Sequence, residues 1–316
     1  MPEIELWHWF AFGALVAVLL ALDLLVFHRH ARAPSLTESA LWTLFWCSLA
    51  LAFNALIWHW RGTEAGVSFL TGYLVEWSLS MDNVFVFAVI FRAFGVALKY
   101  QYRILFWGIL GAIVMRLAFI LVGVELTRRF DWVLFLFGLF LIYTAIRLAR
   151  PAEEEIDPEK NIILRLARRA LRVTRQDQGE RFVARENGRL CVTPLLLVLL
   201  VVESTDVLFA VDSVPAILGI TKDPFVLFTS NIFAILGLRA LYFLLAGAIE
   251  MFRYLHYGLS GVLGFVGVKM VAEYWIGHEG EHLIPPAVSL AVIVSILALA
   301  IGASLVGGRG ARGGGI

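Results

Sequence analysis

Long apolar stretches, separated by short polar connections, run through most of the chain. Each stretch is about 20 residues long, which is the length of an α-helix that crosses the hydrocarbon core of a bilayer. They fall near residues 6–27, 39–60, 67–92, 104–123, 131–149, 194–218, 225–248, 254–274 and 284–306. The pattern predicts an all-α membrane protein with about nine transmembrane helices in a single transmembrane domain, 1–316.

Composition agrees with this pattern and excludes a soluble protein. Of the 316 residues, 60% are hydrophobic and 16% are charged, against roughly 25% charged in ordinary soluble domains. The mean hydropathy is +0.83. The only cysteines, Cys47 and Cys191, suggest neither a disulfide framework nor a thiolate metal site, and we interpret both as small apolar fillers.

Basic residues in the connections predict the orientation of the helices. Lysine and arginine gather after the first, third, fifth, seventh and last stretches, most densely between Arg150 and Arg189, and are few in the opposite connections. Because cytoplasmic connections carry the excess of positive charge, we expect the N-terminus outside and the C-terminus in the cytoplasm. The first apolar stretch follows acidic rather than basic residues, so we expect it to remain as a helix and not to be a cleaved signal.

One long polar connection, residues 150–193, interrupts the apolar pattern. Its segment NIILRLARRALRV predicts a basic amphipathic helix that lies on the anionic cytoplasmic leaflet. One side carries Ile162, Ile163, Leu166, Ala170 and Val173, and the other carries Arg165, Arg168, Arg169 and Arg172. Beside nine spans, the lipid bilayer is the expected partner and nucleic acid is not. The segments RFVAR and RLCVT, on either side of Glu186-Asn187-Gly188, predict a short β-hairpin.

Carboxylates lie inside several of the apolar stretches. An acid at the centre of a membrane helix costs roughly 2.5 to 3.5 kcal/mol, so such residues are functional candidates. Two arginines, Arg116 and Arg239, lie deep in other apolar stretches. This leaves a deficit of four positive charges, which protons or a bound cation must supply. The six acids are Asp23, Glu76, Asp82, Glu203, Asp206 and Asp212.

Two of the acid-bearing stretches are similar in sequence. EWSLSMDNV begins at Glu76 and places an acid at Asp82, and the downstream stretch has the same spacing from Asp206 to Asp212. MRLAFILVG likewise resembles LRALYFLLAG, and each contains an arginine. We interpret residues 67–149 and 194–274 as three-helix repeats, inverted because an odd number of spans separates them. Secondary transporters with this architecture bind substrate near the midplane, between the repeats.

The acids group with neutral oxygen donors on an ideal helix. At about 100° per residue, Glu76, Ser80 and Asn83 form one stripe, and Asp206 and Ser213 form another with Glu203 nearby. Oxygen donors of this kind suit a hard divalent cation such as Mn²⁺, Mg²⁺ or Ca²⁺. The predicted metal ligands are Glu76, Asp82, Asn83, Glu203, Asp206, Asp212 and Ser213, supported by Ser80, Asp23, Arg116 and Arg239.

Some assignments within this set stay open. Asp82 and Asp212 lie about 120° away from the stripes, so either they form a second wall or gate, or the helices unwind near Ser80 and before Pro215. Asp23 either joins the site or caps a histidine cluster at residues 28–30. The two arginines are expected to be counter-charges and not ligands, since a guanidinium cannot bind a cation.

No enzyme motif accounts for the chain. His278-Glu279-Gly280-Glu281-His282 matches H-E-x-x-H, but its glycine and its place in a predicted outer loop favour a solvated loop over a zinc site. No phosphate-binding loop, dinucleotide fingerprint or nucleophile elbow is found, which argues against ATP-driven pumping by this chain alone. We therefore expect no enzymatic activity and no tightly bound cofactor.

At EWSLSMDNVFVF and VVESTDVLFAVDSVPAI, with DLLVFHR near the N-terminus, the chain resembles the TerC/Alx family of integral membrane proteins. The resemblance covers essentially the whole chain. It implies Mn²⁺ export or related metal homeostasis in the bacterial inner membrane, in a family associated with tellurium resistance. Because tellurite is an anion, an acidic site would repel it, so any such phenotype is expected to be indirect.

Two classes of function remain open. The leading hypothesis is a secondary transporter that exports a divalent cation, Mn²⁺ first, with proton exchange on the carboxylates as a source of coupling. The alternative is a membrane assembly partner that delivers metal to exported proteins or helps insertion, with the basic connection as its docking surface. Export of a small organic cation would require a roomier, less acidic cavity. The sequence leaves the oligomeric state open.

Overall fold

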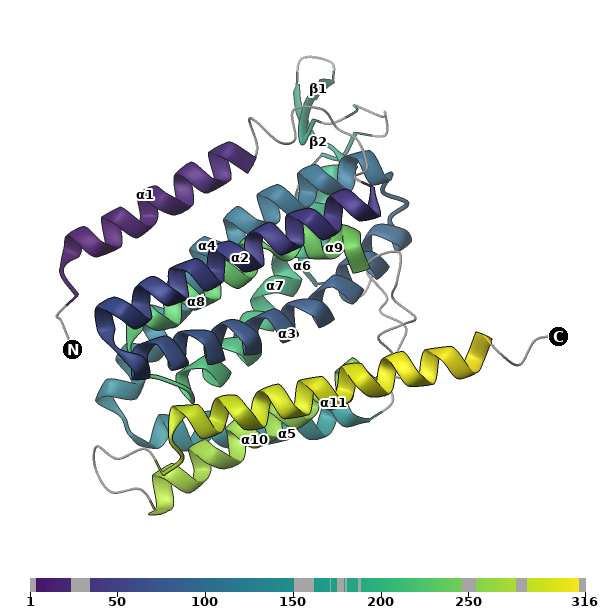
Figure 1. The fold of residues 1–316 in the computed structure, drawn as a ribbon. Coiled ribbons are helices and arrows are strands. Elements are labelled where there is room, and N and C mark those ends of the chain that lie inside the picture. The colour runs from purple at the N-terminus through teal and green to yellow at the C-terminus, as the bar shows by residue number, and fades with distance from the viewer. Residues whose placement is uncertain are drawn as a thin grey trace.

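The computed structural model describes residues 4–23, 35–150, 162–170, 172–174, 179, 181–186, 189–245, 254–276 and 283–312. Apart from two short strands, its regular elements are helices (Figure 1). In order they are α1 (Leu6–Leu22), α2 (Leu36–Arg61), α3 (Thr63–Ala93), α4 (Leu98–Arg129), α5 (Trp132–Ala149), α6 (Ile162–Ala170), β1 (Val183–Glu186), β2 (Arg189–Val192), α7 (Pro194–Leu218), α8 (Pro224–Leu236), α9 (Leu238–Leu245), α10 (Leu255–Ile276) and α11 (Pro286–Arg312).

These elements confirm the predicted all-α membrane protein. Eight helical stretches in the described part of the chain are long and apolar enough to cross a membrane, with α8 and α9 taken together as Pro224–Leu245. The described helix α1 is also apolar but has 17 residues. Each of the nine predicted apolar stretches therefore contains a helix. The predicted helix at 225–248 differs in detail, because the helix is interrupted at Gly237, which separates α8 from α9.

Burial sorts the helices into a centre and a periphery. The span Pro224–Leu245 is completely enclosed by other helices, and α3 is the next most enclosed. α2, α5 and α11 leave most of their apolar surface exposed, which is the arrangement expected of helices that face lipid tails. α3 and α7, the two helices that contain the repeated acidic motif, contact each other. α3 also packs on the central helix α8, and α7 packs on α4, which itself contacts α8.

α5, α10 and α11 lie together on one side of the bundle (Figure 1). α5 and α10 are in close backbone contact where Gly138 faces Gly267. A Cβ atom added to Gly138 would lie 2.9 Å from the carbonyl oxygen of Gly267, so a larger residue there would separate the two backbones. α11 packs on α10 and on α3, which ties this group to the rest of the bundle.

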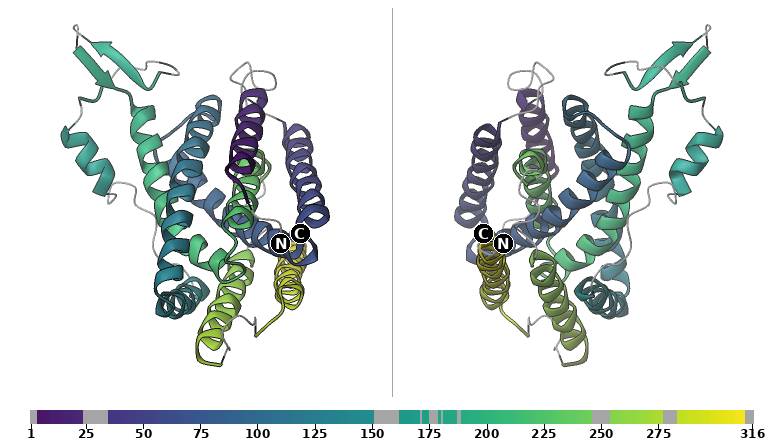
Figure 2. Two further views of the ribbon diagram at one scale, coloured as in Figure 1. Left: turned by 90° about the vertical axis from the view of Figure 1, so that its left-hand side faces the viewer. Right: turned by 90° about the vertical axis from the view of Figure 1, so that its right-hand side faces the viewer.

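The polar connection folds into α6 and an antiparallel β1–β2 hairpin that project from the side of the bundle (Figure 2). The hairpin is confirmed, although its predicted Asn-Gly turn lies outside the described residues. The predicted helix is present as α6; its Leu164 and Ala167 are buried, while Leu166, on the side predicted to face the membrane, is exposed. α6 packs on α7, so its inward face is set by a protein contact that sequence periodicity alone does not show.

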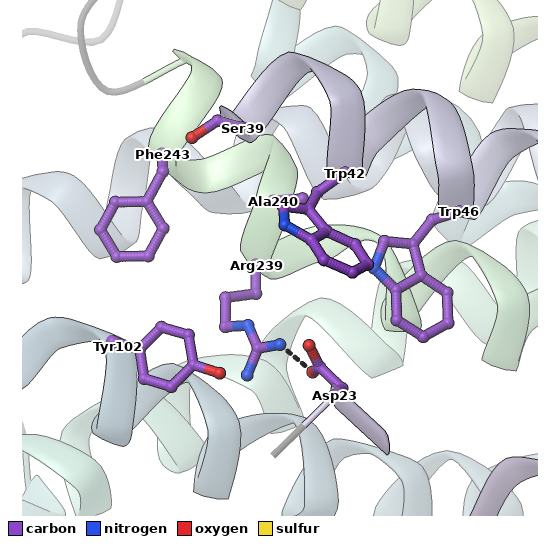
Figure 3. Close-up of a pocket in the computed structure, with 8 residues that line it drawn as sticks. All are labelled: Asp23, Ser39, Trp42, Trp46, Tyr102, Arg239, Ala240 and Phe243. Carbon is purple, nitrogen blue, oxygen red and sulfur yellow. Dashed lines mark hydrogen bonds and ion pairs between the residues drawn. The ribbon is translucent and has the colours of Figure 1, made fainter. Parts of the chain in front are cut away.

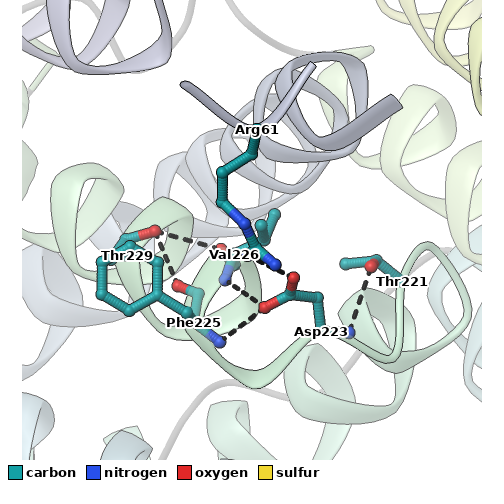
Figure 4. Close-up of polar contacts among 6 residues, drawn as sticks. All are labelled: Arg61, Thr221, Asp223, Phe225, Val226 and Thr229. Atoms are coloured by element: carbon teal, nitrogen blue, oxygen red, sulfur yellow. Dashed lines mark hydrogen bonds and ion pairs between the residues drawn. The ribbon is translucent and has the colours of Figure 1, made fainter. Parts of the chain in front are cut away.

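A charged pair joins the end of α2 to the start of α8 (Figure 4). Arg61 forms an ion pair with Asp223, whose other carboxylate oxygen, Oδ1, accepts hydrogen bonds from the backbone N–H groups of Phe225 at 2.9 Å and Val226 at 3.2 Å. Asp223 is therefore the N-cap of α8, which satisfies backbone donors that a helix leaves free at its start.

Candidate cation site

A buried polar network connects four helices at the centre of the bundle. Glu76 of α3 is fully buried, and its Oε1 lies 2.5 Å from Nη1 of Arg116 in α4. Its Oε2 accepts a hydrogen bond of 3.1 Å from the Asn231 side chain in α8. Arg116 also donates a 2.6 Å hydrogen bond to Ser213 Oγ in α7. One guanidinium thus bridges the two helices that carry the repeated acidic motif.

The helices that hold this network are continuous. α3 runs unbroken through Ser80, and α7 runs unbroken through Pro215 to Leu218. The predicted alternative, in which these helices unwind near Ser80 and before Pro215, is therefore not observed. Ser80 and Asn83 are both buried on α3, where the stripe with Glu76 predicted them.

Two further carboxylates lie beside the network, one helical turn apart on α7. The Glu203 carboxylate lies against Gly111 of α4. A Cβ atom placed on that glycine would lie 2.2 Å from each carboxylate oxygen of Glu203. Asp206 is 5% exposed, and its Oδ2 is buried without a hydrogen-bond partner. Asp206 interacts electrostatically with Arg116, Glu76 and Glu203. Two carboxylates, those of Glu76 and Asp206, therefore interact with one guanidinium, and Glu203 interacts with Asp206.

Asp82 and Asp212 belong to a different part of the bundle. Asp82 interacts electrostatically with His256 at the start of α10. Asp212 Oδ1 accepts a 3.2 Å hydrogen bond from Thr144 Oγ1 of α5, and the same carboxylate interacts with Arg147. Both acids therefore interact with residues of the α5–α10 pair, and neither belongs to the network around Arg116.

Asp23 joins neither the network nor the group beside α5 and α10. It forms an ion pair with Arg239 in a small pocket that the side chains of α2, α4 and α9 also line (Figure 3). The Arg239 guanidinium lies over the Tyr102 ring, with Cζ 4.3 Å from the ring centroid. Such a cation–π contact is favourable where water is excluded. The predicted histidine cluster at 28–30 lies outside the described residues.

The pairing of the two arginines agrees with their predicted role as counter-charges. Arg116 neutralises Glu76, and Arg239 neutralises Asp23. Four of the six predicted intramembrane acids remain, and they lie in two separate places: Asp206 and Glu203 by the network, Asp82 and Asp212 toward α5 and α10. The sequence count overlooked one buried base, Lys269 of α10, whose Nζ lies 3.7 Å from Glu273 Oε1.

Two residues of the site were missed by sequence reasoning. Asn231 stands in the polar run Thr229-Ser230-Asn231 of an otherwise apolar span, and all three are fully buried. That run was a usable signal, because polar side chains inside a membrane helix usually have a partner in the bundle. Gly111 gave no signal, since its role depends on the helix that packs against it.

The described residues hold no group of three or more His, Cys, Asp or Glu side chains arranged to bind a metal ion. Any cation held by Glu203 and Asp206 would therefore complete its coordination with neutral oxygens or water, as hard divalent ions commonly do with one or two carboxylates. The H-E-x-x-H segment at 278–282 lies outside the described residues.

The chain is similar to known membrane proteins along nearly its whole length. Residues 61–310 match the integral membrane protein TerC family. An uncharacterized membrane protein of Myxococcus xanthus is 50% identical over 95% of this chain and 92% of its own. A protein of Escherichia coli K12 named "Putative membrane-bound redox modulator Alx" is 45% identical over 92% of each chain. A membrane protein of Rickettsia bellii is 37% identical over 94% of this chain and 97% of its own. No solved structure matches.

Proposed function

Because the chain belongs to the TerC family of integral membrane proteins, we propose that it is a secondary transporter that exports a divalent metal cation, Mn²⁺ in the first place, from the cytoplasm. The observation that carries this proposal is the buried, unpartnered Oδ2 of Asp206. A buried carboxylate oxygen without a partner costs free energy, and a bound cation would remove that cost.

Charge balance supports a divalent cation. Glu76 and Asp206 interact with the guanidinium of Arg116, and Glu203 interacts with Asp206, so this group of three acids and one arginine carries two uncompensated negative charges when all are ionised. One divalent cation or two protons would neutralise it. Such an exchange would couple export of the metal to entry of protons. Carboxylate oxygens favour Mn²⁺ or Mg²⁺ over metals that prefer thiolates.

Arg116 has a structural part in this proposal. It contacts Glu76 on α3 and Ser213 on α7, and it carries no atom that can bind a cation. It would hold the two acid-bearing helices together while Glu203 and Asp206 bind the ion. In this assignment Glu76 and Ser213 shape the site through Arg116, and the direct ligands are the two acids of α7.

Reciprocal packing supports the predicted inverted repeat. α3 packs on α8, and its counterpart α7 packs on α4. Asp82 of α3 interacts with α10, and its counterpart Asp212 of α7 interacts with α5. Reciprocal contacts of this kind are expected when a twofold axis relates two halves of a chain, as it would in the predicted inverted repeat. Relative movement of the two halves would then alternate access to the site.

Transport of Mn²⁺ into everted membrane vesicles tests the proposal. Vesicles with the wild-type chain should accumulate Mn²⁺, and Asp206→Asn should lower the rate at least tenfold, because it removes one of the two proposed ligands. Asp131→Asn is the matched control, since it makes the same chemical change at an exposed residue, and it should transport normally.

Two results would count against the proposal. Transport by Asp206→Asn at the wild-type rate would reject the site. If the wild-type chain accumulates none of Mn²⁺, Mg²⁺ or Ca²⁺, the chain is not a carrier of divalent ions.

Redox modulation is a second candidate, because relatives at 45% identity carry that name. The residues that could supply thiol chemistry are Cys47 in α2 and Cys191 in β2. The double variant Cys47→Ser/Cys191→Ser separates the candidates. It should keep full Mn²⁺ transport if the chain is a metal carrier, and loss of function in that variant would favour thiol chemistry.

A further inference from the structure

We propose that α6 and the β1–β2 hairpin form a binding surface for anionic phospholipid headgroups. We call this surface the lipid platform and define it by six exposed residues: Arg165, Leu166, Arg169, Val183, Arg185 and Leu190. The platform is distinct from the cation site, and the proposal does not depend on transport.

The platform is held in a fixed position by the spanning helices. α6 packs on α7 through its buried residues Leu164 and Ala167. Before the hairpin, the Phe182 ring meets the Trp107 ring of α4 edge to face, with centroids 6.4 Å apart. The Arg103 guanidinium of α4 lies 5.2 Å from the same Phe182 ring. The contacts of α6 with α7 and of Phe182 with α4 therefore fix the direction in which the exposed face of the platform points.

The hairpin has one buried face and one exposed face. Ala184 pairs with Cys191 in the β1–β2 register, and both are buried. Arg185 pairs with Leu190 on the other face, which also carries Val183, two residues before Arg185. Val183 is 47% exposed and Leu190 is 66% exposed. The outward face thus combines apolar side chains with a guanidinium.

α6 presents the same combination. Leu166 is 59% exposed and stands beside the exposed Arg165, with Arg169 one turn further along. In water, large exposed apolar residues are unfavourable, and their grouping marks an interaction surface. At a membrane interface the leucine enters the acyl boundary while the arginines contact phosphate groups.

Position and charge favour lipid over a soluble protein as the occupant. α6 lies alongside α7, which crosses the membrane, and does not stand beyond its end (Figure 2). A helix in that place is within reach of the headgroups. The platform lies on the side predicted to be cytoplasmic, where membranes carry anionic lipid, and each arginine near such a surface strengthens binding about fivefold.

Retention of lipid by the purified full-length chain tests the proposal. The protein is reconstituted in nanodiscs of equal parts phosphatidylglycerol and phosphatidylcholine, released into detergent, and analysed by native mass spectrometry. The wild-type chain should retain phosphatidylglycerol preferentially. The variant Arg165→Gln/Arg169→Gln should lose about 25-fold of that preference, on the basis of two arginines.

Two comparison variants make the result specific. Arg92→Gln/Lys99→Gln removes the same charge from exposed residues on the same predicted side, outside the platform, and should keep the preference. Arg165→Lys/Arg169→Lys restores the charge and should recover the preference if charge is what matters. Equal melting temperatures of all variants would show that each is folded.

The remaining outcomes overturn the proposal. An unchanged preference in the Arg165→Gln/Arg169→Gln variant means that the platform does not bind anionic lipid. An equal loss in the Arg92→Gln/Lys99→Gln variant means that net charge, and not this surface, selects the lipid.

Discussion

The substitution Gly111→Ala probes the proposed cation site without removing any charged or polar group. In the structure the added Cβ atom would lie 2.2 Å from both carboxylate oxygens of Glu203, and ordinary van der Waals contact begins at 3.4 Å. The carboxylate must therefore move by about 1.2 Å. It stands at the end of a flexible side chain, so it can move while α4 and α7 stay in place.

The expected effect on binding is large and the expected effect on stability is small. Displacing groups that hold or orient metal ligands typically weakens metal affinity about 10- to 100-fold. Alanine also favours a helix over glycine by about 1 kcal/mol, so unfolding is not expected to cause the loss. Mn²⁺ affinity of the purified protein, measured by isothermal titration calorimetry beside a thermal melt, gives both quantities.

Gly108→Ala is the matched control on the same helix. Its added Cβ atom would lie 3.4 Å from a methyl group of Val202, which is ordinary contact, so its Mn²⁺ affinity should equal that of the wild type. The reasoning is refuted if Gly111→Ala binds Mn²⁺ as tightly as the wild type, or if both glycine variants lose affinity to the same extent.

Three further predictions separate stability from binding. Arg116→Gln should lower the free energy of unfolding by about 3–5 kcal/mol by leaving buried Glu76 unpaired, and Glu76→Gln/Arg116→Gln should recover most of that loss in denaturant titrations; an unrecovered double variant would show that the pair is not the cause. Asp206→Asn should raise the melting temperature while abolishing Mn²⁺ binding, because it removes a buried charge with an unsatisfied oxygen; a lower melting temperature would mean that Asp206 is structural. Asp223→Ala should cost at least about 1–2 kcal/mol, because it removes the α8 cap and also the ion pair with Arg61, and it should leave Mn²⁺ affinity unchanged; weaker binding would extend the site to that end of α8.

The helices were predictable because the bilayer imposes a length and an apolar composition on each span. All nine apolar stretches contain helices, and even the hairpin around residues 187–188 was recognisable from its turn sequence. The break at Gly237 was not predictable, since a single glycine within an apolar run occurs in continuous membrane helices as well. Its consequence, a separate short helix that carries Arg239, appears only in the structure.

The sequence predicted which residues belong to the site better than it predicted which of them lie together. Helical periodicity placed Asp206 and Ser213 on one side of their helix and set Asp82 and Asp212 apart from the two stripes, and the structure has this division. It could not show that Arg116 reaches across from α4 to both acidic helices. That contact depends on the crossing of three helices, which the periodicity of any one of them does not determine.

The central claim is that a cation joins the carboxylates of Glu203 and Asp206 inside the bundle. Anomalous diffraction from crystals soaked in Mn²⁺ tests it most directly. The account predicts a manganese peak about 2.2 Å from an oxygen of each carboxylate, with Arg116 still paired to Glu76. A peak only at the protein surface, or none near α7 in fully soaked crystals, would contradict it.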